Sequence, residues 1–195
     1  MSASHPIIAI TGSSGAGTTS VTRTFEKIFR REKLKAAIIE GDSFHRYDRQ
    51  EMRRMLAEQE AAGNRHFSHF GEQANLFEDL EQTFRDYSET GNGRHRRYLH
   101  DEAEASHHGQ EAGTFTPWSE FEPGTDLLFY EGLHGAVRTA TVDVARYPDL
   151  LIGVVPVINL EWIQKLHRDK STRGYSTEAV TDVILRRMND YVHYI

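Results

Sequence analysis

The stretch "AITGSSGAGTTS", residues 9–20, has residue types and a spacing that suit phosphate binding. A phosphate-binding loop reads Gly, four residues, Gly, Lys and then Ser or Thr. Gly12 and Gly17 keep that spacing and Thr19 keeps the hydroxyl, whereas Thr18 stands at the lysine position. Backbone N–H groups of such a loop, and of the helix that follows it, point at the anion. We predict phosphate contacts from Gly12, Ser13, Ser14, Gly15, Ala16, Gly17, Thr18, Thr19 and Ser20.

The same glycines allow two other interpretations. The run "GAGTTS" nearly matches the dinucleotide-binding pattern G-x-G-x-x-G, and Glu40 or Asp42 follows at a suitable distance. Ser20 replaces the third glycine of that pattern, which weakens close packing between helix and strand. A glycine-rich turn without any ligand is the third interpretation, and the loop alone leaves all three open.

Acidic residues near the ends of two further strands favour the phosphate-binding interpretation. Glu131 ends the hydrophobic run "TDLLFYE", where it could hold magnesium together with the hydroxyl of Thr19 or Ser20. Asp42 follows the run "KAAIIEG" and could take a proton from a hydroxyl group. If the next residues are helical, His45 and Arg49 share a face and could grip an anionic substrate. The alternative is that Asp42 only caps a helix.

A later helix offers the positive charge that the glycine loop lacks. Lys165, Arg168 and Asp169 lie at i, i+3 and i+4, hence on one helix face, and Arg173 follows in a predicted short loop. Lys or Arg side chains delivered from outside the loop can stabilise a phosphoryl group in transfer. From the spacing alone, however, a surface ladder of salt bridges from Glu161 through Lys165 to Asp169 is favoured.

The composition indicates one cytoplasmic domain. The chain has 195 residues, no cysteine and a net charge of -6, which argue against disulfides and against general nucleic-acid binding. The apolar runs are too short to span a bilayer and the first residues do not form a signal peptide, so we expect a soluble protein. Histidines in the polar segment 92–118 indicate a solvent-exposed loop more than a metal site.

Apolar runs alternate with amphipathic segments along the chain. We expect buried strands at 6–11, 35–42, 125–132 and 149–157, and helices at 19–33, 49–63, 75–91, 159–171 and 176–195. This pattern predicts an α/β fold in which a mostly parallel sheet carries helices on both faces. Segment 92–118 is polar and glycine-containing, and we expect it to be a mobile insertion in a single domain of residues 1–195.

Taken together, several runs of this sequence resemble bacterial-type phosphoribulokinases, within the P-loop kinase group that includes uridine kinase. The runs are "ITGSSGAGT", "IEGDSFHR", "FSHF", "DLLFYEGLHGAV" and "IGVVPVINLEWIQKLHRDKSTRGYSTEAVTDVILRRM". Bacterial phosphoribulokinases also lack lysine in the glycine loop, so Thr18 fits the resemblance. It implies a transferase that uses ATP to phosphorylate D-ribulose 5-phosphate at its C1 hydroxyl. The product, ribulose 1,5-bisphosphate, is the carbon dioxide acceptor of the Calvin cycle.

The resemblance also implies a role for each candidate residue. Asp42 would be the general base, and Lys165 and Arg168 would stabilise the transition state. Magnesium partners would be Thr19, Glu131 and Asp169, the last of which is also implied to be catalytic. His45, Arg49 and Arg173 would contact the substrate phosphate. ATP and Mg²⁺ would be the cofactors.

Beyond the site, the resemblance implies a homo-oligomer that NADH activates and AMP inhibits. Family members run on for roughly another hundred residues, comparable to a small domain. We therefore expect the chain to be a fragment that lacks a C-terminal portion. The alternatives are another small-molecule kinase, such as a uridine kinase-like enzyme, and a catalytically incomplete nucleotide-binding fragment.

Overall fold

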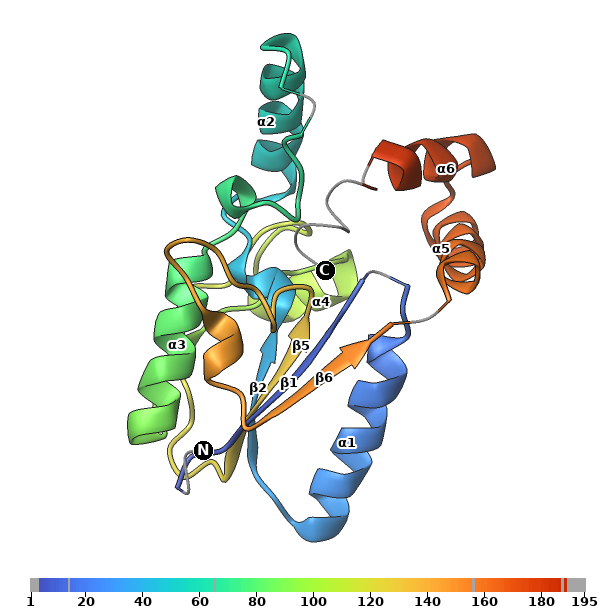
Figure 1. Cartoon of the computed structure of the whole chain (residues 1–195). Helices are drawn as coiled ribbons and strands as arrows, with labels where there is room; N and C mark the ends of the chain where they lie inside the picture. The colour runs from blue at the N-terminus through green and yellow to red at the C-terminus, as the bar shows by residue number, and fades with distance from the viewer. Residues whose placement is uncertain (1–3, 14, 65, 156, 187, 189–195) are drawn as a thin grey trace.

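A four-stranded parallel sheet forms the centre of the molecule (Figure 1). The structure is a computed structural model; it describes residues 4–13, 15–64, 66–155, 157–186 and 188, and within these it leaves out the side chains of residues 158, 159, 172 and 173. The sheet has the order β2-β5-β1-β6, and each neighbouring pair is parallel. Its strands are β1 (Ile7–Gly12), β2 (Ala36–Glu40), β5 (Leu127–Gly132) and β6 (Leu150–Val154).

The strand order excludes the dinucleotide-binding interpretation. In a dinucleotide-binding fold, the second strand of the chain lies beside the first. Here β5 is inserted between β1 and β2, and β1 pairs with β5 and β6. The interpretation of the glycines as a dinucleotide fingerprint is therefore wrong, because a local pattern of three small residues does not encode strand order.

Helices cover both faces of the sheet, as predicted. Side chains of β5 alternate between the faces, so Tyr130 joins one core cluster and Phe129 the other. Helix α3 (Phe77–Thr90) packs on the first face, where Phe84 meets the Tyr130 ring edge-on. Helix α1 (Thr18–Glu32) packs on the second, where Phe29 meets Phe129 in the same way. The two buried faces explain why the strands are continuously apolar.

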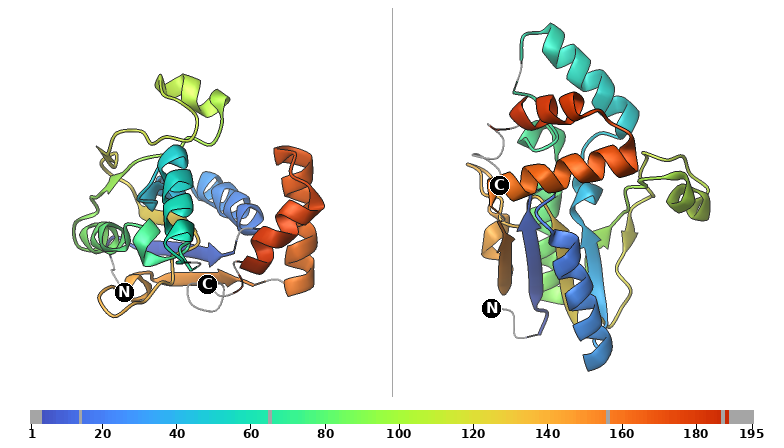
Figure 2. Two further views of the ribbon diagram at one scale, coloured as in Figure 1. Left: turned by 90° about the horizontal axis from the view of Figure 1, so that it is seen from above. Right: turned by 90° about the vertical axis from the view of Figure 1, so that its right-hand side faces the viewer.

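The remaining helices gather near the carboxyl ends of the strands (Figures 1 and 2). Among them, α2 (Arg49–Ala61) projects from that end of the sheet, while α5 (Ile158–Arg173) and α6 (Thr177–Arg186) lie beyond β6. The Ser176 hydroxyl accepts a hydrogen bond from the Ala179 N–H, as expected of a cap for α6. The predicted continuation of this helix to residue 195 falls outside the described residues. Short 3-10 turns are η1 (Gly41–Phe44), η2 (Glu72–Ala74) and η3 (Val144–Arg146).

Segment 92–118 has more structure than its polar sequence predicts. Strand β3 (Arg94–His95) pairs antiparallel with β4 (Ser119–Glu120), and α4 (Glu102–His108) lies between them in the chain. Arg96 ties the segment to the domain, because its guanidinium donates to the carbonyls of Ser43 (2.8 Å) and His45 (2.6 Å). The mobility of this insertion stays a prediction.

Helix α5 extends further along the chain than the sequence predicts. Arg173 is the last residue of α5 and does not lie in a loop, because the helix continues until Gly174 adopts a left-handed conformation (φ 69°) and ends it. In the described part of the chain, no helix combines the length and the hydrophobicity that crossing a membrane requires.

Candidate active site

The glycine loop joins β1 to α1. Gly15 (φ 107°) and Gly17 (φ 100°) have positive backbone φ angles that residues other than glycine rarely adopt. Within the described residues, no side chain caps the start of α1, and its first turn carries no acid. The N-terminal N–H groups of this helix are therefore suited to an anion, and the helix dipole favours negative charge there.

The space around the loop fits a phosphate cradle. A Cβ added to Gly12 would lie 2.7 Å from the carbonyl oxygen of Val154, so glycine is required for packing against β6. A Cβ added to Gly17 would meet no described heavy atom within 4 Å, so the loop is open at that point. Ser13 and Ala16 are buried, and Ser14 lies outside the described residues. The phosphate contacts assigned to the loop remain a prediction that this geometry supports.

Thr18, at the lysine position, has a partner of its own. Its buried side chain hydrogen-bonds the carboxylate of Glu131, whereas Thr19 and Ser20 are exposed. Successive helical residues are rotated by about 100°, so Thr18 and Thr19 face different directions at the start of α1. The structure thus brings Thr18 to the acid of β5, a contact that sequence reasoning missed. The assignment of Thr19 to magnesium stays a prediction.

Acidic side chains meet where β2 and β5 end. Glu131 pairs in register with Glu40, and Asp42 follows in η1. Burial raises the pKa of Glu131, the charges of Asp42 and Glu40 raise it further, and the Thr18 hydrogen bond partly offsets this. A cation beside Glu131 would relieve this repulsion.

The donor set at this point fits a nucleotide-bound magnesium ion. The described residues contain no group of three or more His, Asp or Glu side chains that could hold a metal by themselves. Magnesium bound with a nucleotide commonly takes only one or two protein carboxylates, with phosphate oxygens and water as its other ligands. Glu131 is placed to supply such a carboxylate.

Asp42 lies between two histidines. Its Oδ1 is 3.2 Å from Nε2 of His45, and its Oδ2 is 3.8 Å from Nε2 of His100. Burial alone would raise the pKa of Asp42, but its hydrogen bond to His45 and the nearby histidine charges outweigh burial and lower the pKa to about 2. Asp42 is therefore ionised at neutral pH, and its side chain is 43% exposed, so it is open to a substrate.

His45 and Arg49 do not share a helix face, so that expectation is wrong. His45 follows η1, whereas α2 begins only at Arg49. Asp48 is the N-cap of α2 and forms a capping box with Glu51 in its first turn. Arg49 instead donates from Nη2 to the carbonyl oxygen of His100 (2.7 Å). The chain turns between the two residues, which a helical spacing of four could not reveal.

Helix α5 carries its basic face directly against the glycine loop. Lys165, Arg168 and Asp169 share a face as predicted: Lys165 Nζ lies 3.0 Å from Asp169 Oδ2, and Arg168 Nε lies 2.9 Å from Oδ1. A Cβ on Gly15 would be 3.5 Å from Cβ of Lys165. Lys165 and Asp169 are each 4% exposed. The salt bridge between them is therefore buried, and the prediction of a ladder on the protein surface is wrong. The sequence could not reveal that α5 packs on the loop.

The charges on α5 determine the state of Asp169. Burial would raise its pKa, but hydrogen bonds from Arg168 and Lys165 outweigh burial and lower it. Asp169 is thus an ionised acid bonded to Lys165 and Arg168, one turn along α5 from the residue that packs beside Gly15. The side chain of Arg173 lies outside the described residues, so its predicted substrate contact stays a prediction.

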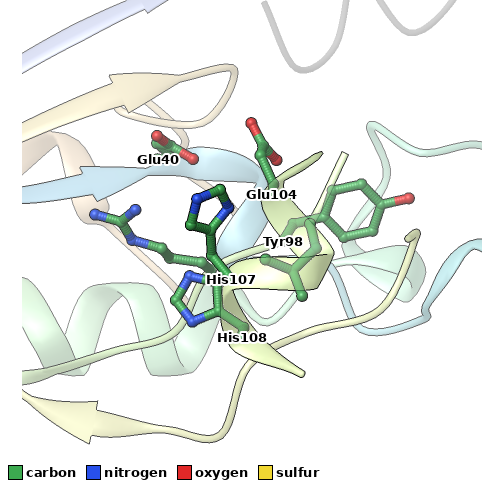
Figure 3. A pocket seen from close by; sticks show the side chains of 7 residues that line it. Glu40, Tyr98, Glu104, His107 and His108 are labelled. Atoms are coloured by element: carbon green, nitrogen blue, oxygen red, sulfur yellow. The ribbon is translucent and has the colours of Figure 1, made fainter. Parts of the chain in front are cut away.

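A pocket of about 330 Å³ opens beside the acidic end of β2, and sequence reasoning did not foresee it (Figure 3). Glu40 lies on one side of it, and side chains of α4 and of the stretch before α4 lie on the other. Its lining residues are Glu40, Arg97, Tyr98, Leu99, Glu104, His107 and His108. The pocket makes segment 92–118 a wall of the region next to the site.

The parallel sheet, the open glycine loop before α1 and the acids at the ends of β2 and β5 define the chain as a P-loop protein of the type that transfers phosphoryl groups. Residues 7–195 match the model of the Phosphoribulokinase / Uridine kinase family, and the chain belongs to that family.

Relatives with full-length similarity to this chain carry the first of those two names. Phosphoribulokinase (chromosomal) of Cupriavidus necator is 71% identical over 195 residues, which cover 100% of this chain and 67% of that protein. Phosphoribulokinase of Nitrobacter vulgaris is 68% identical over 191 residues, covering 98% and 66%. The solved structure of phosphoribulokinase from Rhodobacter spheroides superposes with a TM-score of 0.83 at 56% identity, covering 97% and 64%. The chain thus spans about two thirds of the length of these relatives.

Proposed function

We propose that this chain uses ATP to phosphorylate D-ribulose 5-phosphate, giving ribulose 1,5-bisphosphate, the carbon dioxide acceptor of the Calvin cycle. The two relatives from Cupriavidus necator and Nitrobacter vulgaris, at 71% and 68% identity, support phosphoribulokinase over a uridine kinase-like enzyme. The observation that carries the proposal is the packing of α5 on the glycine loop, where a Cβ on Gly15 would lie 3.5 Å from Cβ of Lys165, because this packing would let Lys165 serve a loop that lacks its own lysine.

Asp42 would act on the hydroxyl that is phosphorylated. It is ionised and partly exposed, so it can accept a hydrogen bond from the hydroxyl and take its proton. A pKa of about 2 makes it a weak base. Phosphoryl transfer through a loose transition state needs little base strength before the bond to phosphorus forms, so orientation of the hydroxyl is the larger contribution.

The cations of α5 would stabilise the phosphoryl group in transfer. When bound, ATP with Mg²⁺ supplies the phosphoryl group, and the metal neutralises part of its charge. Glycine-loop N–H groups and Glu131, with Thr19 and Asp169, would hold this cofactor. Lys165 and Arg168 would supply positive charge in place of the missing lysine, and Asp169 holds both in position through hydrogen bonds of 3.0 and 2.9 Å.

The remaining roles are also proposals. His45, Arg49 and Arg173 would bind the substrate phosphate; Arg49 uses one N–H group on His100, and a guanidinium has five. A homo-oligomer, activation by NADH and inhibition by AMP follow from the resemblance alone. The cytoplasmic location and a mobile insertion in one domain of residues 1–195 are proposed from the composition and length of the sequence.

An ADP-release assay with purified chain, ATP and Mg²⁺ tests the proposal. We expect ADP release with ribulose 5-phosphate and none with uridine. Asp42→Asn should lower kcat by about 10²–10⁴-fold while ATP binding persists, because Asp42 acts on the acceptor. ATP binding without ADP release from the unaltered chain would instead support the catalytically incomplete alternative.

A further inference from the structure

A buried asparagine lies directly behind the Asp42–His45 pair. Asn75 is 1% exposed, and its Oδ1 is 2.8 Å from Nδ1 of His45. Its Nδ2 donates to the carbonyl oxygens of His69 (2.7 Å) and Gly71 (2.8 Å). The backbones of His45 and Asn75 also form an isolated antiparallel bridge, so the two residues are tied together twice.

The two carbonyl groups determine which way the amide of Asn75 points. If the amide were turned over, its oxygen would face two carbonyl oxygens, and both contacts would be repulsive. Nδ2 must therefore face His69 and Gly71, and Oδ1 must face the ring of His45. An amide oxygen only accepts hydrogen bonds, so Nδ1 of His45 has to donate.

The ring of His45 thus has a hydrogen-bond acceptor at each nitrogen. Nδ1 faces the amide oxygen of Asn75, and Nε2 faces the carboxylate of Asp42 at 3.2 Å. A neutral imidazole carries one N–H, so either neutral tautomer would turn a lone pair toward an oxygen atom. Only the doubly protonated ring satisfies both contacts.

We infer that Asn75 is a positioning residue that holds His45 as a cation with its Nε2–H directed at Asp42. His45 then keeps Oδ1 of Asp42 occupied and leaves Oδ2 for the substrate hydroxyl. Both N–H groups of His45 are then in use, so His45 would attract the substrate phosphate through its positive charge and not through a hydrogen bond. This consequence for catalysis rests on the proposed function; the protonation of His45 does not.

Other titratable groups around the pair do not reverse this assignment. Burial favours the neutral ring, but the bonds to Asp42 and Asn75 outweigh burial and raise the pKa of His45, while the charge of Arg96 opposes this. Other titratable groups near the pair are His69, Tyr98, His100, Tyr130, Glu131 and His134.

Proton and nitrogen NMR of the imidazole groups tests the inference on the unaltered chain without any substrate. We expect His45 to titrate above the ordinary histidine value of about 6.5, with protons on both ring nitrogens below its own pKa. In Asn75→Ala that pKa should fall, whereas it should not move in Asn64→Ala, whose lost amide bonds the Gln59 side chain and the backbone N–H of His66. A neutral His45 ring near pH 6.5 in the unaltered chain would overturn the inference, even if Asn75→Ala did not fold.

Enzyme kinetics separate positioning from a merely structural role. Asn75→Ala should lower kcat/KM by about tenfold, and the loss should shrink as the pH is lowered, because acid restores the proton on His45. A structural defect would persist at every pH. In a His45→Gln background, Asn75→Ala should cost little more, because its partner is already absent.

The two readouts distinguish this inference from the proposed function. A raised His45 pKa that falls in Asn75→Ala, in a chain inactive on ribulose 5-phosphate, would contradict the function and leave the inference standing. Full activity with an unshifted His45 would contradict the inference alone. An equal effect of Asn75→Ala in both backgrounds would also contradict it.

Discussion

At the residue scale, one substitution in the glycine loop is balanced by one residue elsewhere. Thr18 stands where lysine is usual, is buried, and bonds Glu131. Lys165 of α5 packs beside Gly15 through its Cβ, and in the proposed function it would supply the positive charge that the loop lacks. A cation on a separate helix can approach or leave the loop when that helix moves, whereas a lysine inside the loop cannot.

Thr18→Lys tests this substitution. We expect no gain in kcat and a lower affinity for Mg²⁺, because the lysine would displace the hydroxyl bonded to Glu131 and form an ion pair with that carboxylate. Steady-state kinetics across a magnesium titration measures both quantities, with exposed Thr24→Lys on α1 as a control for added charge. A faster enzyme would show that the positive charge from α5 is insufficient.

The Asp42–His45 pair gives a pH-dependent contribution to stability. The pKa of His45 is raised by folding, so its contribution is complete below the unfolded value of about 6.5 and is lost as the pH rises through the raised value. We expect His45→Gln to lower the free energy of unfolding more at about pH 6 than at about pH 9. Urea unfolding at the two pH values measures the difference. An equal loss at both would contradict the charged state of His45.

At the element scale, segment 92–118 supports the loop that carries Asp42. Arg96 holds η1 through two backbone carbonyls and lies over the rings of Phe115 (3.7 Å) and Trp118 (4.8 Å). Stacking on aromatic rings fixes the orientation of the Arg96 guanidinium plane, so its two donating N–H groups stay directed at the carbonyls of Ser43 and His45. A movement of an insertion attached in this way would also move η1, which carries the proposed base Asp42.

Arg96→Lys should lower kcat by about tenfold, because lysine cannot bond both carbonyls in one plane and the η1 turn loosens. Arg94→Lys is a matched control: Arg94 also lies over Trp118, but it pairs with Asp79 and not with η1. Steady-state kinetics gives kcat for both variants, and we expect a clear loss only in Arg96→Lys. Equal losses would show that the insertion acts only through general packing.

At the scale of the whole molecule, the site gathers at one end of the sheet. Parallel strands bring all their carboxyl ends to the same edge, and here the glycine loop follows β1, Asp42 follows β2 and Glu131 lies in β5. Helix α5 follows β6 and lies beyond the carboxyl end of that strand (Figure 2), with Lys165 beside Gly15 of the loop. A ligand bound at the proposed site would contact several elements at once, so binding should stabilise the domain as a whole.

Thermal unfolding measures this linkage. ATP with Mg²⁺ at about 100 times its dissociation constant should stabilise the fold by about 2.7 kcal/mol, and removal of Mg²⁺ with a chelator should abolish most of the gain. Glu131→Gln should remove the magnesium-dependent part only, since the glycine loop is untouched. A shift that is the same with and without Mg²⁺ would contradict a metal partner at Glu131.

The sequence by itself determined the elements and many of the chemical groups. Periodicity predicted the four sheet strands, the helices on both faces and the shared face of Lys165, Arg168 and Asp169, because these depend on neighbours within a few residues. The tertiary structure alone decided the strand order, the burial of that face against Gly15 and the bonds that Asn75 and Arg96 make to the η1 region. The partners in those bonds are 30 and 53 residues apart, and such contacts arise from how elements cross, which no local pattern encodes.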